Sequence, residues 1–173
     1  MSRITLFEED YDLAIPGAPG KPSAGSHALP SEHVEAMNIV RPFMPEAQMR
    51  FLEKDLLCGE EAQFFVDKIA ELAGIIKTMP ATYEQDGKGN EAVAFLHYFY
   101  GHSHWYITEK DKDGAGTEQA FGYAVLNGDL VCAELGYISI DELRGIGLDV
   151  QLDFHYAPQP LSQIKASMVA RYG

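Results

Sequence analysis

The stretch FGYAVLNGDLVCAELGYISIDEL, residues 121–143, decides the fold of this chain. Two apolar runs, Phe121–Leu126 and Leu130–Ile138, flank the dipeptide Asn127-Gly128. Asn-Gly favours a type I′ turn, because both central residues of that turn need a positive φ. We therefore predict a tight antiparallel hairpin about Asn127-Gly128.

A helix is predicted to begin directly after this hairpin. Ser139 can accept a hydrogen bond from the amide of Glu142, and the Glu142 side chain can return one, at the spacing of a capping box. Ile138 and Leu143 hold the two positions of a hydrophobic staple. Hairpin, cap and helix are all specified locally, so we expect the core of the fold here.

Further helices are predicted on both sides of this segment. Apolar residues recur at intervals of three and four over Glu60–Met79, which indicates an amphipathic core helix. Pro45 marks the start of a shorter helix. A closing helix is predicted from Leu161 onwards.

Strands are predicted in the second half of the chain. Ala92–Tyr100 and Ser103–Glu109 are rich in aromatic and branched residues and flank a turn at Gly101-His102. Leu148–Tyr156 alternates between apolar and polar residues, which is typical of a strand with one buried face. These segments predict an α+β fold, in which a mostly antiparallel sheet of about five strands packs against amino-terminal helices.

Three segments carry a family resemblance: Trp105–Glu109 (WYITE), Ala120–Gly122 (AFG) and Glu134–Leu143 (ELGYISIDEL). This pattern is similar to that of the DUF2958 family of uncharacterised proteins, and the similarity extends over roughly residues 44–164. The family's longer stretch after the helix is shortened here to Arg144–Leu148. The resemblance implies a protein encoded on phages, plasmids or integrated elements, and it implies no established activity or catalytic residue.

The amino-terminal segment has the composition of an arm. Seven of the fifteen residues in Pro16–Pro30 are Pro or Gly, which sustains neither a helix nor a strand. We expect residues 1–37 to form a Pro/Gly-rich arm, with a short helix from Ser31, and residues 38–173 to form a single α+β domain. The arm is predicted to dock through Leu6 and Phe7 in an apolar site.

The charge balance is the clearest feature of the composition. The chain has 26 acidic and 13 basic residues, a net charge of −13. This excludes direct nucleic-acid binding by electrostatics, because phosphate contacts need Lys and Arg. Residues 117–157 hold seven carboxylates and one basic residue. Such an acidic face predicts a protein partner with a basic surface, although solubility alone also explains it.

The sequence has no run of apolar residues long enough for a membrane helix and no signal peptide, so we expect a cytoplasmic protein without membrane contact. The two cysteines, Cys58 and Cys132, lack metal-binding spacing and are predicted to be reduced core residues. The oligomeric state is left open.

Glu134 is the first candidate for a polar site. A hairpin about Asn127-Gly128 would place Glu134 opposite Phe121, on a face shared with Tyr123 and Cys132. A carboxylate among such residues needs water or a bonding partner, because burying it unpaired is costly. The full candidate set is Glu134, Asp153, His155, Trp105 and Glu109.

Histidines offer a second constellation. His102 and His104 lie two residues apart near a turn, and Asp153 and His155 share a predicted strand face. Imidazole nitrogens and a carboxylate suit a divalent metal, which makes His102, His104 and His155 the candidate ligands. Nothing in the sequence places the two pairs together, so we expect neither a metal nor another cofactor.

These observations leave three hypotheses. The leading one is a non-enzymatic acidic interaction protein of a mobile genetic element, acting by anti-restriction or another form of anti-defence through binding a basic protein surface. The second is a small metal- or nucleotide-dependent enzyme with a cleft around Glu134, Asp153 and His155. The third is a phage particle-associated protein. Convergence of the three cleft residues would favour the enzyme.

Overall fold

The computed structural model describes residues 31–56, 60–146 and 149–173. The predicted docking of Leu6 and Phe7 and the environment of Cys58 lie outside these ranges. Helix α1 (Ser31–Val40) continues across residue 37, the predicted boundary between the arm and the domain. Met37 and Val40 of this helix are both buried in the core. The predicted short helix from Ser31 is confirmed.

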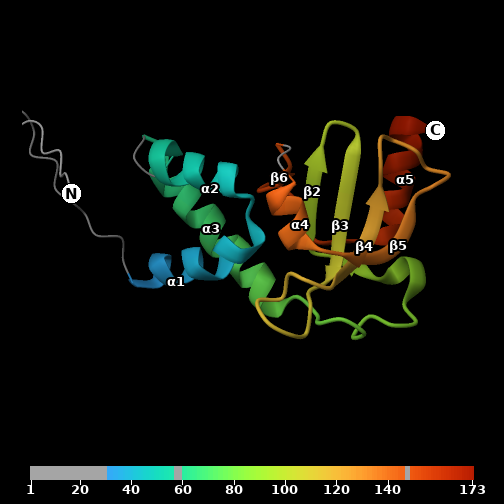
Figure 1. The fold of residues 1–173 in the computed structure, drawn as a ribbon, viewed down its shortest axis with the longest axis horizontal. Helices are drawn as coiled ribbons and strands as arrows, with labels where there is room; N and C mark the ends of the chain where they lie inside the picture. The colour runs from blue at the N-terminus through green and yellow to red at the C-terminus, as the bar shows by residue number, and fades with distance from the viewer. Residues whose placement is uncertain (1–30, 57–59, 147–148) are drawn as a thin grey trace, which may run out of the picture.

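The amino-terminal helices form one layer (Figure 1). After α1 come α2 (Glu46–Phe51) and α3 (Ala62–Thr78), with a 3-10 turn at Arg41–Phe43 and a π-helical turn at Leu52–Leu56. α1 packs against α3. The predicted core face of α3 is confirmed, since Ile69, Leu72, Ile76 and the capping residue Met79 are all buried.

The main sheet consists of β2 (Leu96–Tyr100), β3 (Ser103–Glu109), β4 (Ala120–Val125), β5 (Glu134–Ile138) and β6 (Gln151–Leu152). Its strand order is β5-β4-β3-β2-β6, and all neighbouring strands are antiparallel. A second, two-stranded sheet pairs β1 (Val93–Ala94) with β7 (Gln159–Pro160). The predicted α+β fold is confirmed.

Two hydrophobic cores lie against the main sheet. The larger core joins α1, α3 and α4 (Ile140–Gly145) to strand residues such as Tyr98 and Ile107. The smaller core joins Tyr106 and Tyr123 to α5 (Leu161–Tyr172), whose buried residues are Leu161, Ile164 and Met168. Figure 1 shows α1, α2 and α3 beside the β6 end of the sheet, whereas α5 lies toward the other end. The predicted closing helix is confirmed.

The predicted hairpin register is wrong. Asn127 and Gly128 adopt φ values of 53° and 73°, and the amide of Asp129 donates to Leu126 O at 2.9 Å, so the type I′ turn forms. The strands do not continue from it, because the Asp129 carboxylate accepts from the amides of Val131 and Cys132 and bends the chain away. Residues 126–133 are therefore a loop, and Cys132 is exposed instead of lying in the core.

The predicted strand Leu148–Tyr156 is reduced to the two residues of β6. Asp153 ends it, because its carboxylate accepts from the amide of His155 at 2.9 Å and starts a turn. On the outer edge of β6, the Gln48 side chain donates to Leu152 O at 2.8 Å and accepts from Leu152 N at 2.9 Å. A side-chain amide from α2 thus takes the place of a further strand.

One of the two hydrogen bonds of the capping box predicted for α4 is present. The Ser139 hydroxyl accepts from the amide of Glu142 at 3.1 Å, and Ile138 and Leu143 are both buried as the staple requires. Within the described ranges, the Glu142 side chain returns no bond to Ser139.

We expect Ser139→Ala to lower the free energy of unfolding by about 0.5–2 kcal/mol, because an amide of the first turn loses its acceptor. Urea unfolding followed by circular dichroism measures this change. Ser167→Ala is the control, because Ser167 is exposed on α5 and its hydroxyl only donates to Gln163 O of the same helix. Equal midpoints for Ser139→Ala and the wild type would contradict the cap.

Candidate functional site

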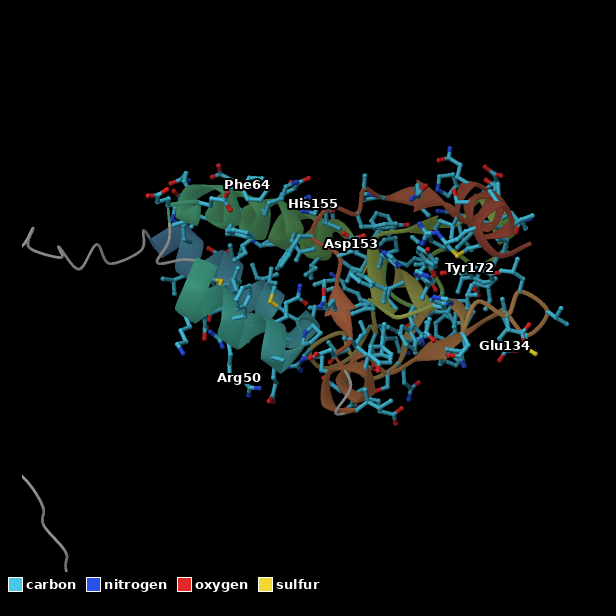
Figure 2. The ribbon with its side chains drawn as sticks, turned by 90° about the horizontal axis from the view of Figure 1, so that it is seen from above. Arg50, Phe64, Glu134, Asp153, His155 and Tyr172 are labelled. Carbon is cyan, nitrogen blue, oxygen red and sulfur yellow. The ribbon has the colours of Figure 1, made fainter. Side chains whose placement is uncertain are left out.

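The structure does not bring the predicted cleft residues together. Glu134 begins β5 and Asp153 follows β6, at opposite edges of the main sheet (Figure 2). Glu134 pairs with Ala124 instead of Phe121, and it is exposed. His155 is also exposed, with its ring 6.2 Å from that of Phe64. Glu134 therefore does not share a site with Asp153 and His155.

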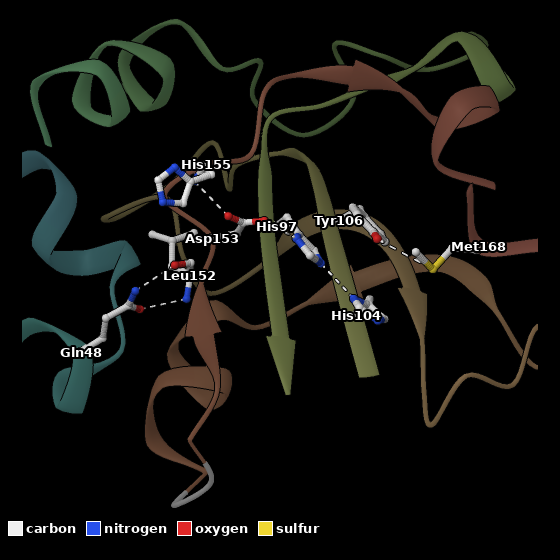
Figure 3. A network of polar contacts seen from close by, with 8 residues as sticks. All are labelled: Gln48, His97, His104, Tyr106, Leu152, Asp153, His155 and Met168. Atoms are coloured by element: carbon white, nitrogen blue, oxygen red, sulfur yellow. Dashed lines mark hydrogen bonds and ion pairs between the residues drawn. The ribbon is translucent and has the colours of Figure 1, made fainter. Parts of the chain in front are cut away.

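Asp153 belongs to a chain of hydrogen bonds that crosses the sheet (Figure 3). Its Oδ2 lies 3.1 Å from His97 Nδ1. His97 Nε2 lies 3.0 Å from His104 Nδ1, and His104 Nε2 lies 2.9 Å from the Tyr172 hydroxyl. This histidine chain, Asp153–His97–His104–Tyr172, connects the turn after β6 to β2, β3 and α5.

The hydrogen bonds of the histidine chain determine which ring nitrogen of His97 and of His104 carries the proton. The Asp153 carboxylate only accepts, so His97 Nδ1 donates to it and His97 Nε2 accepts from His104 Nδ1. His104 Nε2 then accepts from Tyr172. Burial lowers the pKa of His97, and burial with the neighbouring His97 and Arg171 lowers the pKa of His104 to about 4. Both rings are therefore neutral at pH 7.

We expect the folded protein to lose stability as the pH falls from about 6.5 to about 4. Since the pKa of each ring is lower in the folded state than the usual 6.5, the unfolded chain binds protons first. The stability that the neutral histidine chain contributes is complete above pH 6.5 and is lost as the pH falls from 6.5 to about 4. The melting temperature should fall by several degrees.

Thermal unfolding at closely spaced pH values tests this expectation. His104→Gln should reduce the loss of stability at low pH, because it removes the group whose pKa burial lowers to about 4. His155→Gln is the control, because His155 is exposed. A decrease of equal size in His104→Gln and the wild type would assign it to other groups.

Of the three candidate metal ligands, His102 and His104 both lie beside Tyr172, but His155 does not join them. His104 uses both ring nitrogens in the histidine chain, and His102 is exposed with its ring 5.8 Å from Tyr172. His155 lies on another segment, beside α3. Within the described ranges, no group of three His, Cys, Asp or Glu side chains is arranged to hold a metal ion.

The remaining candidates lie on opposite faces of β3. Trp105 is half-buried against the larger core. Glu109 is 3% exposed and lies on the other face, after an irregularity between Ile107 and Glu109 that shifts the register of β3 against β4. Its carboxylate accepts from the amides of Tyr83, at 3.2 Å, and of Gln85. Glu109 therefore anchors the loop 81–92 to the sheet.

A groove lies over this carboxylate, between the loop 81–92 and β5. One pocket of about 140 Å³ is lined by Thr82, Tyr83, Asp86, Glu109, Phe121 and Tyr137. An adjoining pocket of about 310 Å³ shares Asp86, Glu109 and Phe121 and extends to Gly89 and Leu135. We call these two pockets together the Tyr83–Tyr137 groove.

The groove exposes large apolar side chains. Tyr83 is 56% exposed, Leu135 41% and Tyr137 58%. The hydroxyls of Tyr83 and Tyr137 lie 2.9 Å apart. Tyr83 has a φ of 79°, which costs free energy in a bulky residue and persists only where its surroundings impose it. The groove is therefore built before any ligand arrives.

Sequence reasoning selected Glu109 and Asp153 but missed their bonding partners, Tyr83 and His97. His97 has a detectable signal, because pairing about Gly101-His102 places it near His104 on one face of the hairpin. Tyr83 has none, since a polar loop with two glycines does not reveal which non-glycine residue takes a positive φ.

The fold and these two sites define a small α+β domain with an internal histidine chain and an open aromatic groove on the same sheet. The chain belongs to the family described as "Protein of unknown function (DUF2958)", which matches residues 68–167. The predicted resemblance is thereby confirmed. No curated protein and no solved structure gives a significant match to the chain. Within the described ranges, no helix combines the length and apolar character needed to cross a membrane.

Proposed function

We propose that this protein is a non-enzymatic interaction protein that binds a basic surface of another protein through the Tyr83–Tyr137 groove. The observation that carries the proposal is the groove itself, in which exposed aromatic rings surround a buried carboxylate. Exposed aromatic side chains with a polar tip are the residues that most often provide binding energy at protein interfaces.

The charges around the groove favour a basic partner. Asp86 lines both pockets, and Glu84 is exposed on the flanking loop. The whole chain has a net charge of −13, so its field attracts cations over distances beyond contact. The anchored loop 81–92 also lowers the ordering cost of binding.

The enzyme hypothesis lacks support in this geometry, because its proposed cleft residues lie at opposite sheet edges. The genetic setting that the resemblance implies supports a narrower proposal. In it, the partner is a cytoplasmic host or phage protein, such as a restriction or other defence protein, whose basic surface the acidic groove occupies.

We expect Tyr137→Ser to abolish capture of the partner from an extract of the native host cell. The wild-type protein should retain a basic protein at low salt and lose it at high salt, because exposed charges are screened within about 8–10 Å at physiological ionic strength. Mass spectrometry identifies the proteins retained. Val169→Ser, at a 60% exposed site on α5, is the control and should capture as the wild type does.

Capture that is independent of salt, or equal for Tyr137→Ser and Val169→Ser, would contradict the proposal. The first result would remove the electrostatic contribution, and the second would place the interface away from the groove.

A further inference from the structure

We propose that the 140 Å³ pocket of the groove binds the guanidinium group of an arginine side chain, presented by the partner. This inference rests on the proposed function, because it names the group that enters the same site. It is carried by three features of the pocket: a carboxylate anchored by backbone amides, aromatic walls, and an accessible position beside an edge strand.

The carboxylate is that of Glu109. Both of its oxygens accept one backbone N–H, from Tyr83 and Gln85. A carboxylate offers about four lone-pair positions, so half of its acceptor capacity remains. Within the described ranges, no Lys or Arg nitrogen lies within 4 Å of it, although it is 3% exposed. A buried negative charge of this kind is stabilised by a cation.

The walls of the pocket suit a cation as well. Phe121 and Tyr137 are in contact edge to face, with ring centroids 5.5 Å apart, and Tyr83 lies across from them. Aromatic faces attract cations, most strongly where water is excluded. The Lys112 ammonium, which does not line the pocket, already lies 5.9 Å from the Tyr83 ring. Asp86 adds a second carboxylate at the rim.

These features favour arginine over lysine. The guanidinium group is planar and weakly hydrated, it stacks on aromatic rings, and it forms paired bonds to carboxylates. An ammonium group is compact and strongly hydrated, so its transfer into a pocket walled by three rings costs more.

The surroundings of the pocket indicate how the arginine is presented. β5 is an edge strand, and its residues Leu135 and Tyr137 line the groove on one side. The adjoining 310 Å³ pocket shares Asp86, Glu109 and Phe121 with the arginine site. In an extended segment of the partner, residues two positions apart point to the same side, so an apolar residue two positions from the arginine can occupy this second pocket.

The test uses three small probes with the same capped backbone, the N-acetyl, N′-methylamide derivatives of arginine, lysine and citrulline, of which citrulline has nearly the shape of arginine but no charge. Each is titrated into the isotope-labelled full chain while the amide resonances are followed by NMR. We expect the arginine probe to shift the amides of Tyr83, Gln85 and Tyr137 in a saturable manner. The neutral citrulline probe should bind at least about tenfold more weakly, and the lysine probe should lie between them.

Two variants locate the site. Asp86→Asn should weaken binding of the arginine probe about threefold to tenfold, whereas Asp67→Asn, at an exposed position of α3, should not change it. Tyr137→Leu keeps an apolar wall and should also weaken binding. Citrulline binding as tight as arginine, or equal binding to Asp86→Asn and Asp67→Asn, would overturn the inference. If the arginine probe fails while Tyr137→Ser still loses the captured partner, the arginine assignment falls and the proposed function stands.

Discussion

Gly122→Ala is expected to prevent stable folding. A Cβ atom at Gly122 would lie 2.2 Å from Tyr106 O and 3.0 Å from Ile107 Cα. Both atoms belong to the backbone of β3, so no side-chain rotation relieves the contact. β4 would have to move away from β3 at the centre of the sheet. We expect a loss of more than about 3 kcal/mol, a large part of the about 5–15 kcal/mol that stabilises a domain.

The matched control for this variant is Gly136→Ala. Gly136 lies directly opposite Gly122 on β5, and a Cβ atom there meets no other atom within 4 Å. Its stability should be close to that of the wild type. Circular dichroism and urea unfolding compare the two variants. A native spectrum and an unchanged midpoint for Gly122→Ala would show that β3 and β4 are not so close.

Glu109→Ala is expected to lower the free energy of unfolding by about 2–4 kcal/mol. It leaves the amides of Tyr83 and Gln85 without their acceptors, and a buried unsatisfied donor costs about 1–3 kcal/mol. The bond that holds the Tyr83 backbone against Glu109 is then lost. The Gln85 side chain still bonds Val93 and Thr108 O, so we expect the segment around Tyr83 to loosen and the groove to be distorted.

Urea unfolding measures the total loss, and hydrogen exchange at Tyr83 and Gln85 locates it. Both amides should exchange much faster in Glu109→Ala than in the wild type, whereas α3 should keep its protection relative to global unfolding. Glu118→Ala is the control, because Glu118 is exposed. Unchanged exchange at both amides would mean that Glu109 does not anchor the loop.

The sequence predicts those parts of the fold that short-range patterns specify. The core face of α3, the pairing of β2 with β3 about Gly101-His102 and the Ser139 cap each depend on residues within a few turns or strand positions. The register of β5 does not. Its turn forms as predicted, but Gly128 donates to His102 O and packs against Tyr172. Contacts with these distant segments therefore position the turn as much as the two strands beside it do.

The candidate sites divide in the same way. Glu109 and Asp153 could be selected as carboxylates in or beside apolar segments. Their partners come from elsewhere in the chain, since Asp153 meets His97 across 56 residues and Glu109 meets Tyr83 across 26. Alternation in Leu148–Tyr156 predicted a long strand, but Asp153 instead bonds its own backbone at His155 and ends it.

The Gln48 side chain, bonded to both backbone groups of Leu152 (Figure 3), affects how copies of this protein can meet. An edge-to-edge fibril needs two open sheet edges on every molecule, one to receive and one to offer. Here the amide on α2 closes the β6 edge, and β5 is the edge that stays available. Strand pairing through β5 can therefore join two molecules but cannot extend to a third, so this sheet is protected from open-ended polymerisation.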